Sequence, residues 1–301
     1  MSWFYIALLS PLLFAIVNLI DDNMIRHVYK SPYFGAIISG LFGAVPLVAL
    51  ALRPLEPVTI LVGALATLAG FLTAVYYFFY FRALETESPS VVIAMFSLTP
   101  ALIPVFARIF LRERLVVMQL VGFAVVLLAS FGLGMTEVRK FKFSRALLHV
   151  SVAATIYAGV SLFSKYAFLH TDFFTGYMYF SAGLGIGGLY FLLILKFLNG
   201  DSFFKDLRHN SKKIISLFII AEAIAIAAEF TQNLAISRGP VSLVKVIEGV
   251  QPVYVLLIAL AFYRFSPKHF REAAEGGLIK KFALMSISII GLFLIHIATK
   301  A

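Results

Sequence analysis

Cysteine is absent from this chain of 301 residues, and charged side chains are scarce, at 13% of the total. The lack of cysteine excludes disulfide frameworks, thiol catalysis and metal sites built on thiolates. The scarcity of charge excludes a soluble domain of this length, because soluble domains carry about 25% charged and about 45–50% apolar residues. Hydrophobic residues instead make up 61% of the chain. The composition therefore predicts an integral membrane protein.

Sequence signatures of enzymes are also missing. The six histidines are scattered and form no HExxH pattern, and no GxSxG sequence occurs. The adjacent Asp21 and Asp22 lack the second acidic partner that a diphosphate site of the DDxxD type needs. We therefore expect no enzyme activity, no metal and no cofactor. The net charge of +10 comes from basic residues in the connections, where they set topology and contact anionic lipid headgroups, so we expect no nucleic acid.

The chain instead contains long apolar stretches, and each can cross a membrane as a helix. A span needs about 20 mostly apolar residues, and a helix satisfies its own backbone groups inside a bilayer. The first twenty residues lack the basic stretch and cleavage site of a signal peptide, and we expect them to form a span. Small residues at 181–190 predict close helix packing. The ten expected spans of this all-α fold are 3–25, 32–52, 58–82, 88–111, 115–135, 145–168, 173–198, 214–236, 240–263 and 278–299.

Two segments of the chain recur at a nearly constant spacing. Residues 83–112 align with 235–264 at an offset of 152, and residues 14–22 align with 157–165 at an offset of 143. An odd number of spans in each copy places the copies in opposite orientations. Inverted repeats of this kind are typical of secondary transporters, whose substrate sites lie near the midplane. We therefore expect two inverted five-helix repeats, residues 1–140 and 141–301.

The segment YFFYFRALETESPSVVIAMFSLTPALIPVFARIFLRERL resembles the end of the third helix and the whole fourth helix of the EamA family in the drug/metabolite transporter superfamily. FTQNLAISRGPVSLVKVIEGVQPVYVLLIAL is similar to the second copy of that pattern, although YRFSPKHF replaces the ERL turn after it. The resemblance covers nearly the full length. It implies a ten-helix inverted-repeat fold, a central cavity, and export or exchange of small metabolites.

A few ionisable residues lie inside the expected spans, where each costs about 2.5–3.5 kcal/mol at a helix centre. Glu229 and Glu248 flank one short turn and both lie roughly 11–12 Å below the same membrane face, at about 1.5 Å per residue. Lys245 stands three residues before Glu248, a spacing that lets side chains meet. At the repeat offset, Glu229 corresponds to Tyr77 and Glu248 to Phe96. The scaffold therefore does not require these charges, and the asymmetric cluster predicts a site for substrate or protons.

Further polar residues are expected around the same cavity. Simpler roles remain open for several of them: Lys245 can reach the interface or form a purely structural pair, Asp22 and Lys165 can be ordinary helix-end charges, and the uncharged residues can form hydrogen bonds between helices. The additional candidates for the substrate or proton site are Glu222, Asp22, Lys165, Asn18, Tyr77, Ser161, Gln232 and Gln251.

These features together predict a secondary active transporter of a small polar metabolite that works by alternating access. The mixture of acidic and basic residues favours an amino acid or a similar zwitterion. A carboxylate in a dry pocket beside another carboxylate can hold a proton near neutral pH, so proton coupling is expected as an option. The alternatives are a transporter or flippase of an amphiphilic or lipid-linked substrate, and a channel or scramblase. The expected location is the prokaryotic plasma (inner) membrane.

Overall fold

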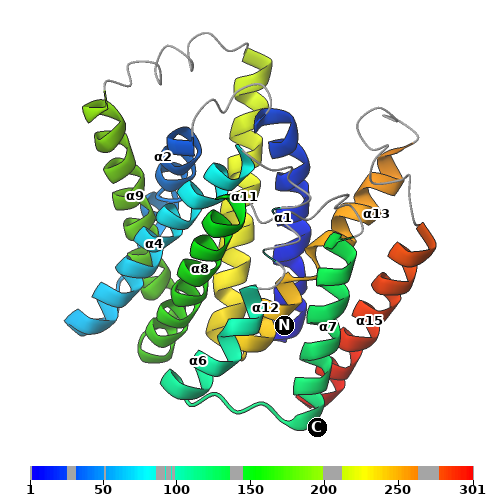
Figure 1. Ribbon diagram of the computed structural model, residues 1–301. Helices are drawn as coiled ribbons and strands as arrows, with labels where there is room; N and C mark the ends of the chain where they lie inside the picture. Colours follow the sequence, from blue (N-terminus) through cyan, green and yellow to red (C-terminus); the bar gives the residue numbers. More distant parts are fainter. Residues whose placement is uncertain are drawn as a thin grey trace.

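The computed structural model describes residues 2–25, 32–50, 52–85, 92, 96, 99–135, 145–198, 212–263 and 278–300. Within these ranges the regular structure is helical, and no strand occurs. The expectation of an all-α fold is therefore confirmed. The elements shown in Figure 1 are α1 (Trp3–Ile25), α2 (Pro32–Phe42), α3 (Pro46–Leu50), α4 (Ile60–Leu84), η1 (Thr99–Leu102), α6 (Ile103–Phe110), α7 (Val117–Met135), α8 (Arg145–His170), α9 (Phe173–Phe197), α11 (Lys212–Arg238), α12 (Val241–Glu248), α13 (Gln251–Tyr263) and α15 (Leu278–Lys300).

Most of the expected spans have a counterpart of the right length. In the described part of the chain, 8 helical segments are long and apolar enough to cross a membrane. The expected spans 88–111 and 115–135 are represented by the shorter apolar segments Thr99–Phe110 and Val117–Leu133. The multi-span membrane fold is thus confirmed, while the count of ten crossings stays a prediction.

Two of the expected continuous spans are interrupted. A turn at 43–45 separates α2 from α3, where Pro46 lacks the backbone N–H that a continuing helix needs. The second interruption follows Glu248, where the Gly249 N–H bonds to the carbonyl of Val246 at 3.1 Å and α13 resumes at Gln251. Pro252 occupies the second position of α13, where a missing N–H does no harm.

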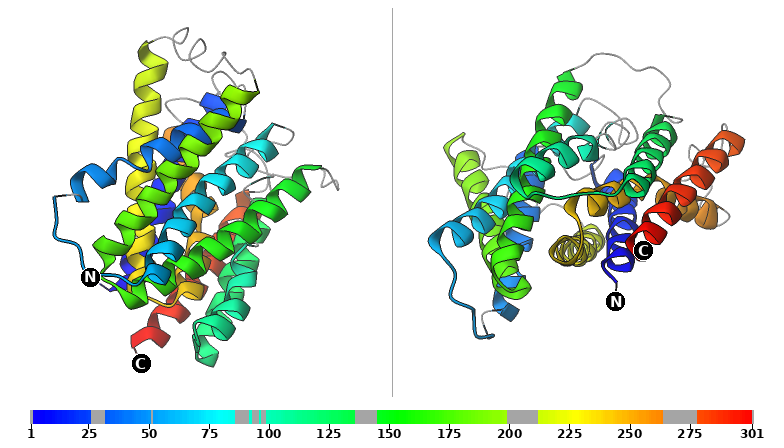
Figure 2. Two further views of the ribbon diagram at one scale, coloured as in Figure 1. Left: turned by 90° about the vertical axis from the view of Figure 1, so that its left-hand side faces the viewer. Right: turned by 90° about the horizontal axis from the view of Figure 1, so that it is seen from below.

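The helices pack in three main groups. The α4 helix lies against both α8 and α9, α1 lies along α11, and α7 pairs with α15. Figures 1 and 2 show α1 and α11 in the middle, with the α7–α15 pair at one edge and α9 toward the other. Both chain ends lie toward the lower side in Figure 1. The elements that carry the predicted site residues therefore meet in the interior.

The α4–α9 contact depends on two glycines that lie against the backbone of the opposite helix. A Cβ atom on Gly70 would lie 1.8 Å from the Phe180 carbonyl oxygen, and one on Gly183 would lie 1.9 Å from the Thr67 carbonyl oxygen. Neither position can hold a side chain unless the helices separate. The close packing predicted for residues 181–190 is confirmed.

Candidate functional site

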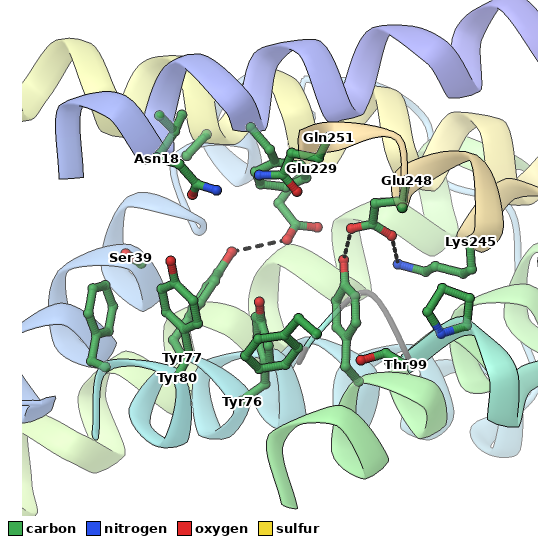
Figure 3. A pocket seen from close by; sticks show the side chains of 18 of the residues that line it. Asn18, Ser39, Tyr76, Tyr77, Tyr80, Thr99, Glu229, Lys245, Glu248 and Gln251 are labelled. Carbon is green, nitrogen blue, oxygen red and sulfur yellow. Dashed lines mark hydrogen bonds and ion pairs between the residues drawn. The ribbon is translucent and has the colours of Figure 1, made fainter. Parts of the chain in front are cut away.

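A polar cavity lies among α1, α2, α4, η1, α6, α8, α11, α12 and α13. Its volume is about 130 Å³, whereas about 10–15 Å³ is enough for one water molecule. The cavity therefore has room for a small organic solute. The polar side chains that line it, most of them labelled in Figure 3, are Asn18, Ser39, Tyr76, Tyr77, Tyr80, Thr99, Tyr157, Glu222, Glu229, Lys245, Glu248 and Gln251.

One end of the cavity holds an ion pair between Lys245 and Glu248. The Lys245 Nζ donates to the Glu248 Oε2 over 2.9 Å, as their spacing along α12 predicts. The same Nζ lies 3.8 Å from the centroid of the Tyr157 ring, which adds a cation–π contact. The Lys245 side chain is only 2% exposed. It is therefore a buried, fully engaged ammonium group and does not extend to the membrane interface.

The hydroxyl of Tyr157 connects this ion pair to α11. It donates to the Glu248 Oε1 over 2.6 Å. A phenol has a single proton to donate, so its contact with Gln232 is one in which the Gln232 Nε2 donates to the hydroxyl over 2.9 Å. Gln232 is thus placed behind the cavity wall, where it orients Tyr157.

The middle of the cavity is occupied by Glu229. Its Oε1 accepts a hydrogen bond from the Tyr77 hydroxyl at 3.0 Å, and Figure 3 shows this contact crossing the cavity from α4 to α11. Its Oε2 accepts a longer bond from the Asn233 Nδ2 at 3.4 Å. The residue is only 6% exposed. Glu229 is therefore a buried carboxylate whose hydrogen bonds within the described chain come from neutral donors.

The other end of the cavity contains Glu222, which lies on the same face of α11 as Glu229, two turns before it. The Ser39 Oγ of α2 donates to the Glu222 Oε1 over 2.9 Å. Asn18 lines the cavity nearby, and in Figure 3 its amide points inward from α1. Carboxylates of α11 and α12 thus occur along the whole length of the cavity.

Aromatic rings form the wall opposite these carboxylates. The rings of Tyr76 and Tyr157 are stacked with centroids 4.6 Å apart, and Tyr76 also stacks on Tyr80 at 6.1 Å. Phe96 meets Tyr76 edge-on at 5.6 Å. In Figure 3 the hydroxyls of Tyr76, Tyr77 and Tyr80 point toward the side of Glu229. The wall therefore presents ring surface and hydroxyl oxygens together.

Lys165 has a different position from the one predicted. Its Nζ donates to the carbonyls of Ile236 and Gly239, each at 2.8 Å, at the turn after α11, and it does not line the cavity. The reason is geometric: the last carbonyls of a helix lack partners within the helix and attract a cation. The pocket role expected for Lys165 is thus replaced by a capping position.

Glu113 holds the other side of the same turn. Its Oε2 accepts from the Val241 N–H at 2.7 Å and its Oε1 from the Ser242 N–H at 3.2 Å. These amides begin α12 and lack partners within the helix. A basic residue of α8 and an acidic residue after α6 thus clamp the turn that joins the two carboxylate-bearing helices.

The predicted site residues fall into three groups. The structure brings Glu222, Glu229, Lys245, Glu248, Asn18, Tyr77 and Gln251 to the cavity. It leaves Ser161, whose hydroxyl bonds to the Tyr157 carbonyl at 2.8 Å, and the residues Gln232 and Lys165 outside the cavity lining. The side chain of Asp22 lies outside the described residues, and its role stays a prediction.

Several lining residues were missed by sequence reasoning, above all Tyr157, Ser39 and Thr99. A signal was present for Tyr157, because the repeat alignment pairs it with Phe14, which also lines the cavity. Thr99 likewise pairs with the predicted Gln251 at the offset of 152. No local pattern distinguishes Ser39 from an ordinary helical serine.

Long apolar helices around this buried polar cavity define an integral multi-pass membrane protein. Residues 1–135 match the model of the EamA-like transporter family, so the resemblance seen in the sequence is confirmed over that part of the chain. A solved structure titled "Crystal structure of protein" matches with a TM-score of 0.64 and 19% identity, covering 95% of this chain and 98% of that one. It supports the fold alone. No curated protein matches.

Proposed function

We propose that the chain is a secondary active transporter that moves a small polar metabolite by alternating access between two inverted five-helix halves, residues 1–140 and 141–301. The convergence of the aligned segments supports this arrangement. Tyr77 and Glu229 correspond to each other at the offset of 152, and they meet directly in the cavity. Contact between corresponding residues is expected near the axis that relates two copies. The substrate site then lies between the halves, as in other inverted-repeat transporters.

Proton coupling through Glu229 is the second part of the proposal. The observation that carries it is the buried carboxylate at the centre of the cavity, held by the hydroxyl of Tyr77 and the amide of Asn233. Burial disfavours the charged form of such a group, and neutral donors compensate for only part of the lost hydration. Glu229 can therefore exchange a proton as the cavity alternates between the two sides of the membrane.

The substrate in this proposal is a small polar metabolite, with an amino acid or a similar zwitterion as the first candidate. The size of the cavity and its polar lining support a small solute. The proposed location is the prokaryotic plasma (inner) membrane. A lipid-linked or amphiphilic substrate is the competing possibility, and the ligand panel described next separates the two.

The test uses the purified protein in detergent and in lipid vesicles. A panel of amino acids, amines, nucleosides, sugars and lipid headgroup analogues is first screened for thermal stabilisation, and ligands that stabilise are then followed in uptake experiments at several pH values. We expect pH-dependent uptake of a water-soluble ligand, and we expect Glu229→Gln to abolish the pH dependence while leaving the fold intact. The matched control is Glu85→Gln, an exposed carboxylate paired with Arg82. Normal pH-dependent uptake by Glu229→Gln would overturn the proton role, and stabilisation by headgroups alone would favour the flippase.

A further inference from the structure

The charges around the cavity are unequal in number. Three carboxylates line it, those of Glu222, Glu229 and Glu248, whereas Lys245 is the one basic side chain among its described lining residues. A low-dielectric site strengthens every charge interaction compared with water. An excess of carboxylates in such a site therefore favours a ligand with positive charge.

Lys245 cannot readily serve as a binding group for a substrate carboxylate. Its Nζ is bonded to Glu248 at 2.9 Å and packed over the Tyr157 ring at 3.8 Å. The side chain is 2% exposed. Turning this ammonium toward a new anion would leave the carboxylate of Glu248 without its partner. A zwitterion would thus bring a carboxylate into a cavity in which Lys245, the one basic side chain among the described lining residues, is already neutralised by Glu248.

The Lys245 contact also shows how this cavity holds an ammonium group. It combines a carboxylate, which supplies a charge-assisted hydrogen bond, with the face of a tyrosine ring. Glu229 has surroundings of the same kind, since Tyr76, Tyr77 and Tyr80 line the cavity on the facing wall. The difference is that, within the described part of the chain, the carboxylate of Glu229 is hydrogen-bonded to a hydroxyl and an amide.

A further polar group in the wall is without a partner. The Oγ1 of Thr99 is buried, with the residue 5% exposed, and it makes no hydrogen bond within the described part of the chain. Thr99 nevertheless lines the cavity. Buried hydroxyls usually have a hydrogen-bond partner, so this one is suited to a ligand with polar hydrogens. A primary ammonium offers three N–H donors, which suits one carboxylate together with hydroxyl oxygens.

We propose that the transported substrate is an organic amine with net positive charge, whose ammonium group contacts Glu229 among the tyrosines of α4. This inference rests on the proposed transport function and, within the small polar metabolites, replaces the zwitterion with an organic cation as the substrate. A zwitterion of the same size is discriminated against, because its carboxylate is buried beside Glu229 and the Lys245–Glu248 pair, with no available cation among the described lining residues.

The test compares matched pairs that differ only in the carboxylate: phenylalanine with phenethylamine, leucine with isoamylamine, and lysine with cadaverine. Binding to the purified wild-type protein is measured by calorimetry and thermal stabilisation in detergent, without any gradient. We expect the amine of at least one pair to bind tenfold or more tightly than its amino acid, a factor of about 1.4 kcal/mol. Glu229→Gln should remove this preference. Amino acids that bind as tightly as their amines would overturn the inference, and so would a panel in which no amine binds.

The double variant Lys245→Met with Glu248→Gln separates this inference from the alternative that Lys245 receives a substrate carboxylate. It removes both partners of the ion pair, so that no unpaired charge is left to disturb the fold. We expect it to retain the preference for the amine, whereas loss of amino-acid binding with no amine preference would overturn the inference. Failure of the transport function has a different signature, namely an amine that binds in detergent but is not moved across vesicle membranes.

Discussion

The two halves of the chain contribute different chemistry to the same cavity. At the repeat offsets of 143 and 152, cavity positions that carry an aromatic ring or a threonine hydroxyl in the first half carry a phenol, a carboxylate or an amide in the second half. One further pair is proline in both halves. Both members of these pairs line the cavity, so the scaffold places corresponding residues alike whatever their side chains. The pairs are Phe14 with Tyr157, Tyr77 with Glu229, Phe96 with Glu248, Thr99 with Gln251, and Pro100 with Pro252.

Under the proposed repeat, in which both halves share one scaffold, the buried charges are not needed to build the fold. The first half reaches the cavity with neutral residues at the positions of Glu229 and Glu248. A charge within the membrane is costly, so its confinement to one half is best explained by a task that needs one acidic wall and one aromatic wall. The same contrast holds at one more position. Gly70, which packs against the backbone of α9, corresponds to Glu222 at the offset of 152.

The largest effect is expected when the charged half loses one member of its ion pair. Lys245→Ala leaves the Glu248 carboxylate without its counter-ion in a buried site, and we expect a loss of about 3–5 kcal/mol of stability. Adding Glu248→Gln should restore part of that loss, because the site then resembles the neutral first half. Thermal denaturation of the purified variants measures both, with Lys280→Ala on an exposed position as control. Additive losses would show that the two side chains do not interact.

The next largest effect concerns the seam between α4 of the first half and α9 of the second half. Gly70→Ala introduces a Cβ atom 1.8 Å from a carbonyl oxygen of α9, so the helices must separate, and we expect a loss of about 1–3 kcal/mol or more. Gly159→Ala is a matched control, because nothing lies within 4 Å of its added Cβ, and alanine there should stabilise the helix by up to about 1 kcal/mol. Equal denaturation temperatures for the two variants would contradict the close seam.

A smaller effect is expected at the turn between α11 and α12. Lys165→Met removes the donor to two helix-end carbonyls, and leaving buried acceptors unpaired costs about 1–3 kcal/mol. Because Lys165 caps a helix and does not line the cavity, the preference among ligands should be unchanged. Denaturation and ligand binding are measured together, with the exposed Lys300→Met as control. A variant that keeps its stability but loses ligand binding would return Lys165 to the substrate site.

The smallest effect is expected for Tyr77→Phe, which makes the first half purely hydrocarbon at this position. The change removes a single hydrogen bond to Glu229, and such bonds contribute about 0.5–1.5 kcal/mol, or up to about 3 kcal/mol when one partner is charged. Tyr179→Phe is the control, since the Tyr179 hydroxyl makes no hydrogen bond within the described ranges. Identical denaturation temperatures for both variants would mean that the contact across the cavity has little energetic value.

Helix positions and the contact between Lys245 and Glu248 could be predicted from the sequence, because both follow from local properties. Apolar length predicts spans, and the three-residue spacing within α12 predicts that Lys245 meets Glu248, which the structure confirms. Gly43 and Pro46 carried a signal for the break in the second expected span, although length alone suggested a continuous helix. Pro252 gave the same signal near the second break.

The partners of individual side chains could not be predicted in this way. Helical periodicity tells which residues share a face, but it does not tell which face of another helix they meet. Lys165 illustrates the problem, since its long side chain reaches the carbonyls of residues 71 and 74 positions later in the sequence. The Ser39–Glu222 contact joins residues that are 183 positions apart. Such contacts depend on helix crossing geometry, which no single-segment pattern records.

The clamp around the turn 237–240 has a consequence for the order of assembly. The first amides of α12 find their acceptor in Glu113, 128 residues earlier for Val241, and the last carbonyls of α11 find their donor in α8. Synthesis runs from the N-terminus, so both clamp residues exist before the turn is made. The late helices therefore dock onto a prepared acid and base. A second half made alone would contain Lys165 but no Glu113, and α12 would begin with its amides unpaired.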